Sequence, residues 1–288
     1  MTLTLSAVSE RLLNSTLPSF PQVVLQVERE LAKPDAAVGA VAALVEQDPP
    51  LAARFLALAN SSFYSRGNPT SSALQAVSRL GLAEARQVVL ATALLQSFGS
   101  LGGADPHRYW THSVTTALLT RELAKLCSST LSRGLVDAAY LAGLLHDIGA
   151  LALAHLFPEE YQPVIDALEE SGRPAWEVEL DLLGFHHGEV GELLVHGWGL
   201  PPAVCASVRF HHEPWSAPQP IIQLVRLVYL SDFVSSNQGF ERHQGNLSQD
   251  FEAGAWDGLG YTIEQVQEIL AQALALGTRS EGLWSFAK

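Results

Sequence analysis

The sequence predicts an all-α protein built from two helical lobes. Apolar residues recur at helical spacing almost throughout the 288 residues, as at Val38, Val41 and Val45, whereas the alternating pattern typical of strands is scarce. The segment GSLGGADP at 99–106 is the most glycine-rich in the chain and predicts a hinge between the lobes. We therefore expect an amino-terminal lobe over residues 1–104 and a carboxy-terminal, metal-binding lobe over residues 105–288.

About six short helices are expected in the amino-terminal lobe, with breaks near Pro34, Pro49 and Gly81. Asp48 followed by Pro49 predicts a helix start. A carboxylate can cap the first turn, and proline is tolerated there because the amide hydrogen that it lacks would have no partner within the helix. Asn60 ends an apolar stretch and predicts a helix end. Capping explains these residue types, and the lobe shows no cluster of acid-base or nucleophilic side chains.

The carboxy-terminal lobe is expected to begin with a long helix from about His107 to Cys127. Apolar periodicity predicts further helices over residues 136–146, 176–195, 202–210 and 221–235, then a polar loop over 237–257 and a last helix over 263–274. The aromatic segment around Trp284 is expected to fold back onto an apolar groove, because exposed aromatic patches are costly. Contact with another chain is the alternative for that segment.

Composition excludes several classes of protein. Apolar residues make up 48% of the chain and charged residues 16%, as in a folded domain and unlike a disordered one. The 17 Lys and Arg against 30 Asp and Glu give a net charge of −13, and no basic run offsets it, so generic nucleic-acid binding is not expected.

Cysteine usage and apolar runs indicate a cytoplasmic protein. Cys127 and Cys205 form no CxxC pair, so neither a thiolate zinc site nor a disulfide framework is expected. The first residues lack the pattern of a signal peptide. The longest apolar run, 141–157, contains His146 and Asp147, which a lipid-spanning helix would not readily carry. We expect no membrane association.

Metal-ligand residue types gather on the predicted helices of the carboxy-terminal lobe. The candidate metal ligands are seven residues: His112, His146, Asp147, His187, His211, His212 and Asp232. Asp147 and Asp232 each follow a strongly apolar segment, where burying an ionised carboxylate costs several kcal/mol unless a cation compensates. Gly149 is expected to mark the end of the apolar helix that carries His146 and Asp147. Imidazole and carboxylate ligands together favour iron, manganese, zinc or nickel over magnesium or calcium. Seven donors suffice for two ions about 3.5–4 Å apart.

A structural role is the alternative for each histidine taken singly, because histidine is often partly buried without binding anything. We assign no role to His107, His155, His196 or His243. A single His-Asp dipeptide is also weak evidence, since the aspartate can cap a helix end. Separate segments that each offer a ligand type favour a shared site over coincidence.

Short motifs in a fixed order carry a family resemblance. The segment LLHDIG at 144–149 resembles the signature of the HD phosphohydrolase superfamily. From about residue 10 to 240 the chain is more specifically similar to the HDOD group, the HD-related output domain of bacterial signalling proteins. That likeness is carried by LPSFP at 17–21, DPPL at 48–51, ANSSFY at 59–64, AVSRLG at 76–81, HGEVG at 187–191, WGLP at 198–201 and HHEP at 211–214.

The resemblance implies roles for the candidate ligands. It places His112, His146, Asp147 and Asp232 at a first metal ion, and His187, His211 and His212 at the additional ion of two-metal relatives such as the HD-GYP phosphodiesterases. It also implies a departure from those enzymes. Ala150 stands where they carry lysine, no Gly-Tyr-Pro follows HHE at 211–213, and Arg108 stands where three-metal relatives offer glutamate. Metal binding is therefore better supported than cyclic di-nucleotide hydrolysis.

The leading hypothesis is a cytoplasmic, HDOD-type signal-transduction protein that holds one or two transition-metal ions and acts mainly through contacts with a protein partner. Iron or manganese is favoured, with zinc and nickel as alternatives. As a non-enzymatic element the metal would act as a staple between helices, or as a sensor that changes the angle between the lobes. The sequence does not indicate the partner or the oligomeric state.

The alternative hypothesis is a metal-dependent phosphohydrolase that acts on a nucleotide or cyclic di-nucleotide. In that case the ions would lower the pKa of a bound water towards 7 and neutralise the phosphoryl oxygens. Asp147 would bridge the ions as the catalytic residue, and Arg209 and Lys125 would help to attract the anionic substrate.

Overall fold

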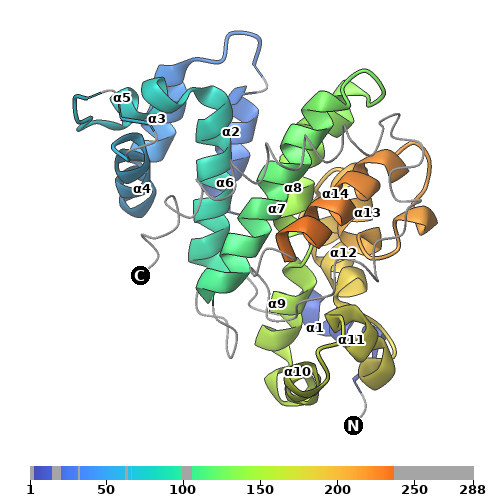
Figure 1. Cartoon of the computed structure of the whole chain (residues 1–288). Helices are drawn as coiled ribbons and strands as arrows, with labels where there is room; N and C mark the ends of the chain where they lie inside the picture. Colours follow the sequence, from blue (N-terminus) through green and yellow to red (C-terminus); the bar gives the residue numbers. More distant parts are fainter. Residues whose placement is uncertain are drawn as a thin grey trace. The chain divides into compact units, whose positions relative to one another are not determined.

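A computed structural model confirms the all-helical fold class. It describes residues 3–14, 21–31, 33–61, 64–65, 67–98 and 106–236. Every regular element within these ranges is a helix, and they contain no strand (Figure 1). The predicted loop over 237–257, the predicted helix over 263–274, His243 and the segment around Trp284 lie outside the described residues.

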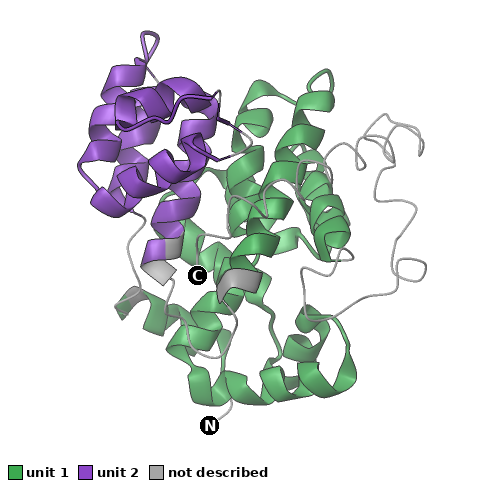
Figure 2. Cartoon of the chain, turned by 60° about the vertical axis from the view of Figure 1, so that its left-hand side comes forward, with its two compact units in different colours: residues 1–17, 100–278 green, residues 18–99, 279–288 purple. Residues whose placement is uncertain are grey.

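The described helices form two compact units (Figure 2). Unit 2 holds α2 (Gln22–Leu31), α3 (Val38–Glu46), α4 (Pro49–Ala59), α5 (Ala73–Leu80) and α6 (Leu82–Phe98). Unit 1 holds α1 (Leu5–Asn14), α7 (Pro106–Leu126), α8 (Arg133–Leu145), α9 (Ile148–Leu156), α10 (Pro158–Ser171), α11 (Ala175–Leu183), α12 (His187–Gly197), α13 (Pro202–Phe210), a 3-10 turn (Pro214–Ser216) and α14 (Ile222–Ser235).

Helix α1 groups with unit 1, where it contacts α12 and where its Val8 side chain is buried. The sequence analysis assigned the whole of residues 1–104 to one lobe. The difference has a physical reason: apolar periodicity identifies the buried face of a helix but not the neighbour that covers this face. The predicted hinge over residues 99–106 lies, apart from Pro106, outside the described residues.

Caps and a polar clamp fix part of unit 2. Asp48 caps α4 through its side chain, and Pro49 occupies the first turn, as predicted. Asn60 ends α4, and its side-chain nitrogen also donates to the Thr70 carbonyl oxygen (2.9 Å) while its side-chain oxygen accepts from the Thr70 amide (2.7 Å). Arg79 donates to two backbone carbonyl oxygens around the same loop (2.9 and 2.7 Å). These side chains therefore hold the connection between α4 and α5.

Local sequence patterns locate most helices of unit 1. The helices α7, α8, α13 and α14 begin and end within a few residues of the predicted ranges. The predicted helix over 176–195 is two helices, α11 and α12. Gly184 ends α11 in the left-handed conformation (φ 80°), which glycine adopts without strain and which interrupts the helix.

The helices α7, α8 and α14 lie side by side and share an apolar core (Figure 1). The close approach of α7 and α8 depends on Gly143, because a Cβ atom there would lie 2.8 Å from the Ala117 Cα atom. Leu119, Ala142 and Leu227 are fully buried in this core. The packing fixes the positions of the polar residues at the ends of the same helices.

Gly149 has a different role from the predicted one. It does not mark a helix exit but lies in the first turn of α9, where a Cβ atom would lie 1.9 Å from the His187 carbonyl oxygen and 2.6 Å from the Gly191 nitrogen. Real Cβ atoms do not approach backbone atoms so closely. Glycine at this position therefore allows the start of α12 to lie directly against α9.

The run formed by α8 and α9 is the one segment of the described chain that is long and apolar enough to cross a membrane, over residues 133–156. Its most apolar window is 78% buried within the protein. A helix in the core of a folded domain meets the same criteria of length and composition. Burial thus marks this run as a core segment.

Gly149→Ala is expected to destabilise the protein by about 3 kcal/mol, because the added methyl group must push α9 away from α12. Urea denaturation measures the free energy of unfolding. Gly134→Ala in α8 is the matched control, since no atom lies within 4 Å of its added Cβ, and it should stabilise by about 0.5–1 kcal/mol. Equal effects of the two substitutions would contradict the close-approach argument.

Candidate metal centre

The elements of unit 1 bring all seven predicted ligand residues into one cluster. His112 lies on α7, His146 and Asp147 join α8 to α9, His187 is the first residue of α12, His211 and His212 follow α13, and Asp232 lies on α14. Among the imidazoles, those of His112, His146, His187 and His211 are buried. The side chains of Asp147 and Asp232 are 13% exposed, so solvent reaches the cluster.

The first group of donors consists of His112, His146, Asp147 and Asp232. The Nε2 atom of His112 lies 3.1 Å from the Nε2 atom of His146 and 3.2 Å from Oδ1 of Asp232. The Nε2 atom of His146 lies 3.0 Å from Oδ2 of Asp147 and 3.5 Å from Oδ1 of Asp232. Four ligands placed tetrahedrally about 2.1 Å from an ion lie roughly 3.4 Å from one another, so these spacings fit an ion.

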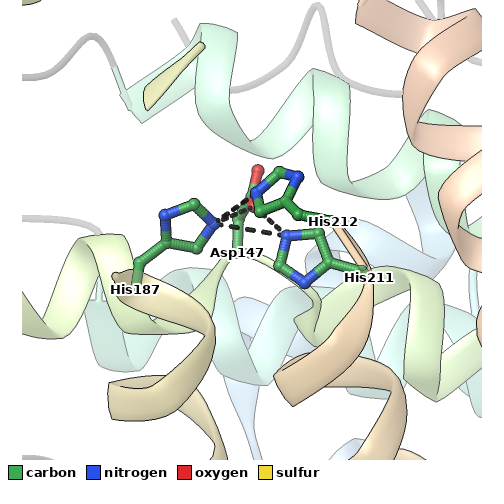
Figure 3. Close-up of side chains that lie close together, drawn as sticks. All are labelled: Asp147, His187, His211 and His212. Atoms are coloured by element: carbon green, nitrogen blue, oxygen red, sulfur yellow. Dashed lines mark hydrogen bonds and ion pairs between the residues drawn. The ribbon is translucent and has the colours of Figure 1, made fainter. Parts of the chain in front are cut away.

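The second group of donors consists of Asp147, His187, His211 and His212, whose side chains point toward one another in Figure 3. The Nε2 atom of His187 lies 3.2 Å from that of His211 and 3.0 Å from that of His212. Oδ1 of Asp147 lies 3.2 Å from His187 Nε2 and 3.3 Å from His211 Nε2. Asp147 thus offers Oδ2 to the first group and Oδ1 to the second, as a carboxylate that bridges two ions does.

Backbone carbonyl groups orient two of the imidazoles. Nδ1 of His146 lies 2.8 Å from the Gly143 oxygen, and Nδ1 of His211 lies 2.8 Å from the Val208 oxygen. A carbonyl oxygen can only accept, so each Nδ1 carries a proton and each Nε2 of the neutral ring presents a lone pair to the cluster. Such an outer partner is typical of histidines that bind metal ions.

Side chains orient two further imidazoles. Nδ1 of His187 donates to Glu179 (2.7 Å), and Nδ1 of His112 lies 3.1 Å from Oγ of Ser235. The Ser235 hydroxyl donates to the Asp232 carbonyl oxygen (2.9 Å) and so accepts from Nδ1 of His112, which leaves the lone pairs of His112 and His146 facing each other across 3.1 Å when both rings are neutral. Two acceptors at that distance repel unless a proton or a cation lies between them, so the donor set fits either a proton in the metal-free protein or a bound metal ion.

Glu179 on α11 is a buried partner that the sequence analysis missed. Its carboxylate is fully buried and accepts hydrogen bonds from the Tyr161 hydroxyl (2.5 Å), the His187 amide (2.8 Å) and the His187 ring. Charged residues alternate with apolar ones along α11, and Glu177 and Asp181 flank Glu179 at equal spacing. No local pattern distinguishes the buried carboxylate from its exposed neighbours.

The carboxylates keep two imidazoles protonated in the absence of metal. Burial alone would lower the pKa of His146, but Asp147 and Asp232 raise it to about 10. Burial would likewise lower the pKa of His187, but Glu179 and Asp147 raise it to about 10.

Four further donors are ready to bind a cation at neutral pH: Asp147, Asp232, His211 and His212. Burial alone would raise the pKa of Asp147 and of Asp232, but the surrounding histidines hold both pKa values well below the usual range. Burial lowers the pKa of His211 and of His212, so these two rings stay neutral.

Other residues singled out from the sequence lie apart from the donors. His155 and His196 are exposed, and the side chains of His107 and Arg108 lie outside the described residues. Lys125 forms an exposed ion pair with Glu122 (2.9 Å). The two cysteines are buried and form no disulfide with each other.

Arg209 and His186 form a second polar contact beside the cluster. Arg209 donates to Glu189 (3.1 Å) and lies 3.2 Å from Nε2 of His186. Nδ1 of His186 accepts from the Gly188 amide and so caps α12, and the Glu189 carboxylate accepts from the His186 amide. This capping box sets the start of α12 and hence the position of His187.

Comparison with known proteins identifies the relatives of the chain. The family model of the HDOD domain matches residues 17–214. An HDOD domain protein of unknown function from Geobacter sulfurreducens has a TM-score of 0.76 and 26% identity, over 92% of this chain and 96% of that chain. A proposed signal transduction protein from Marinobacter aquaeolei VT8 has a TM-score of 0.75 and 27% identity, over 100% of this chain and 61% of that one.

Two further relatives extend the comparison. A proposed phosphohydrolase from Shewanella amazonensis SB2B shares the fold, with a TM-score of 0.68 and 24% identity over 97% of this chain and 96% of that one. An uncharacterised protein of Treponema pallidum (strain Nichols) is 26% identical over 260 residues, which make up 87% of this chain and 49% of that protein. The chain thus spans about half the length of this curated relative.

Glu179→Gln is expected to weaken metal binding by the second group about 10–100-fold, because the amide cannot hold His187 as the carboxylate does. A chelator competition titration with Co²⁺ measures the affinity. Glu177→Gln is the control, since Glu177 lies on the same helix and pairs with Arg173 at the surface. Unchanged affinity in Glu179→Gln would argue against the orienting role.

Metal binding at about pH 7.5 is expected to release about two protons. The pKa values of about 10 keep His146 and His187 protonated in the metal-free protein, and each must lose its proton to become a ligand. Affinity should therefore rise with pH until the pH approaches 10. Calorimetric titration in buffers of different ionisation enthalpy counts the protons, and a count near zero would contradict the assignment.

Proposed function

The chain belongs to the HDOD domain family, and from that premise we propose that it is a regulatory protein of signal transduction whose unit 1 holds one or two transition-metal ions. The observation that carries the proposal is the position of Asp147, which offers one oxygen to each of two groups of histidines. Imidazole and carboxylate donors in this ratio favour iron or manganese, with zinc and nickel as alternatives.

A structural action of the metal is consistent with the origin of the ligands. They come from α7, α12, α14 and the segments after α8 and α13, which are far apart in the chain. Binding one ion would couple the positions of these segments, so that occupancy of the site controls the shape of unit 1. Such a protein would act in the cytoplasm through contacts with a protein partner, and the net charge of −13 does not suit nucleic acid as that partner.

A metal-dependent phosphohydrolase is the second candidate. The observation that favours it is the pairing of two donor groups around one shared carboxylate, since two-metal sites of this type are used in phosphoester hydrolysis. Bound ions would supply Lewis acidity and an activated water. In this chain Asp147 would hold the two positions at a fixed separation, and Glu179 would keep His187 oriented. The substrate would be a nucleotide or a cyclic di-nucleotide.

Removal of the metal by a chelator is expected to lower the melting temperature of the wild-type protein by roughly 5–10 °C, since a ligand present at about 100 times its Kd contributes about 2.7 kcal/mol. Differential scanning calorimetry before and after dialysis against the chelator measures the change. Restoring Mn²⁺ or Fe²⁺ should restore the melting temperature. A melting temperature that ignores the chelator, in protein shown to contain metal beforehand, would contradict a stapling role.

The double variant His146→Ala, Asp147→Ala distinguishes the two candidates. Elemental analysis should find metal in the wild type and little in the variant, with His155→Ala, an exposed histidine, as control. Phosphodiester, cyclic di-nucleotide and nucleotide substrates should not be hydrolysed by either protein. Turnover that only the double variant lacks would instead establish the phosphohydrolase. Stable wild-type protein without metal would exclude both candidates.

A further inference from the structure

His212 is held differently from the other imidazoles of the cluster. The Nδ1 atoms of His112, His146, His187 and His211 each have a hydrogen-bond partner. Within the described part of the chain, Nδ1 of His212 has none, and the ring is only half-buried. Among the described residues, its polar contact is the 3.0 Å approach of its Nε2 atom to Nε2 of His187.

An aromatic surface takes the place of the missing hydrogen bond. The ring of His212 stacks on the indole of Trp176 in α11, with centroids 5.7 Å apart and planes inclined by 25°. Hydrogen bonds fix the direction of an imidazole, whereas a stacked aromatic face fixes its plane but lets the ring slide. The rings of His211 and His187 also lie near that of His212, with centroids 3.9 and 4.9 Å away. Hydrogen bonds at Nδ1 hold the rings of His187 and His211, whereas His212 has no such bond among the described residues.

With metal ions bound, the net charge of the cluster would favour an anion at the position of His212. Two divalent ions bring four positive charges, and the carboxylates in contact with the donors are those of Asp147, Asp232 and Glu179. The cluster therefore keeps a net positive charge when both groups are filled. The 13% exposure of Asp147 gives solvent and small anions access.

We propose that His212 is the exchangeable ligand of the second group, which gives up its position to an oxyanion such as inorganic phosphate while the other donors keep the ion in place. Trp176 is the positioning residue that guides the ring. With an ion bound, a phosphate oxygen would take the position that His212 Nε2 gives up, with no change in oxidation state. The proposal rests on metal binding in the proposed function, but it assigns unequal roles to adjacent histidines.

Cobalt substitution in the full chain tests this assignment. The wild type, His212→Ala and His211→Ala are loaded with Co²⁺, cobalt content is measured by elemental analysis, and the visible spectrum is followed during titration with inorganic phosphate. His212→Ala should keep two ions per chain, whereas His211→Ala should keep only the ion of the first group. That retained ion in both variants also shows that unit 1 is folded.

The phosphate titration measures the exchange itself. If His212 must leave the ion before phosphate binds, replacing His212 by alanine should tighten phosphate binding about tenfold, because every molecule then has an ion that is open to phosphate. Trp176→Leu should shift the affinity in the same direction without loss of cobalt. Trp215→Leu is the matched control, since that exposed indole contacts Tyr229 and none of the donors, and it should behave like the wild type.

The outcomes separate the two levels of the argument. Wild-type protein that binds no cobalt would overturn both the proposed function and the exchange. A wild type with two ions would leave the proposed function standing. In that case, loss of the second ion from His212→Ala, or a phosphate affinity equal to that of the wild type, would overturn the exchange alone.

Discussion

The structure depends on one largely buried carboxylate that two sets of imidazoles share. Placing Asp147 between α8 and α9 leaves its side chain only 13% exposed to water, which is costly unless cations or donors surround it. The neighbouring histidines meet that requirement, and the orientation of four of them is constrained, because each of these four presents Nε2 to the cluster while its Nδ1 atom has another partner. Carbonyl groups at the ends of α8 and α13, Glu179 and Ser235 are those partners. The polar geometry of unit 1 follows from this single placement.

Backbone contacts make the shared carboxylate possible. Gly143 lets α7 approach α8, and Gly149 lets the start of α12 rest against α9. Without both approaches His112 and His187 would stand too far from Asp147 to share it. The apolar core formed by α7, α8 and α14 keeps these helices in fixed relative positions. The positions of the candidate metal ligands therefore depend on the packing of unit 1.

Sequence reasoning reached the features that local patterns encode. The helices α7, α13 and α14 follow from apolar periodicity, the start of α4 follows from Asp48, and the candidate ligands follow from residue type on apolar helices. Three features depend on contacts between distant segments and could not be reached in this way. The sequence around the buried Glu179 does not differ from that around the more exposed Glu177. The need for glycine at position 149 becomes clear only from the contact with α12. The sequence of α1 does not indicate which unit this helix joins.

Among the described residues, the helices of unit 2 lie in the chain between α1 and α7, which both belong to unit 1. The contact between α1 and α12 therefore closes a loop that contains α2 to α6, and the entropy lost in such a closure grows with the length of free chain. A folded unit 2 shortens that free chain before α1 meets α12. If the α4–α5 clamp of Asn60 and Arg79 forms before this contact, it would speed the docking of α1 in a unit to which neither residue belongs.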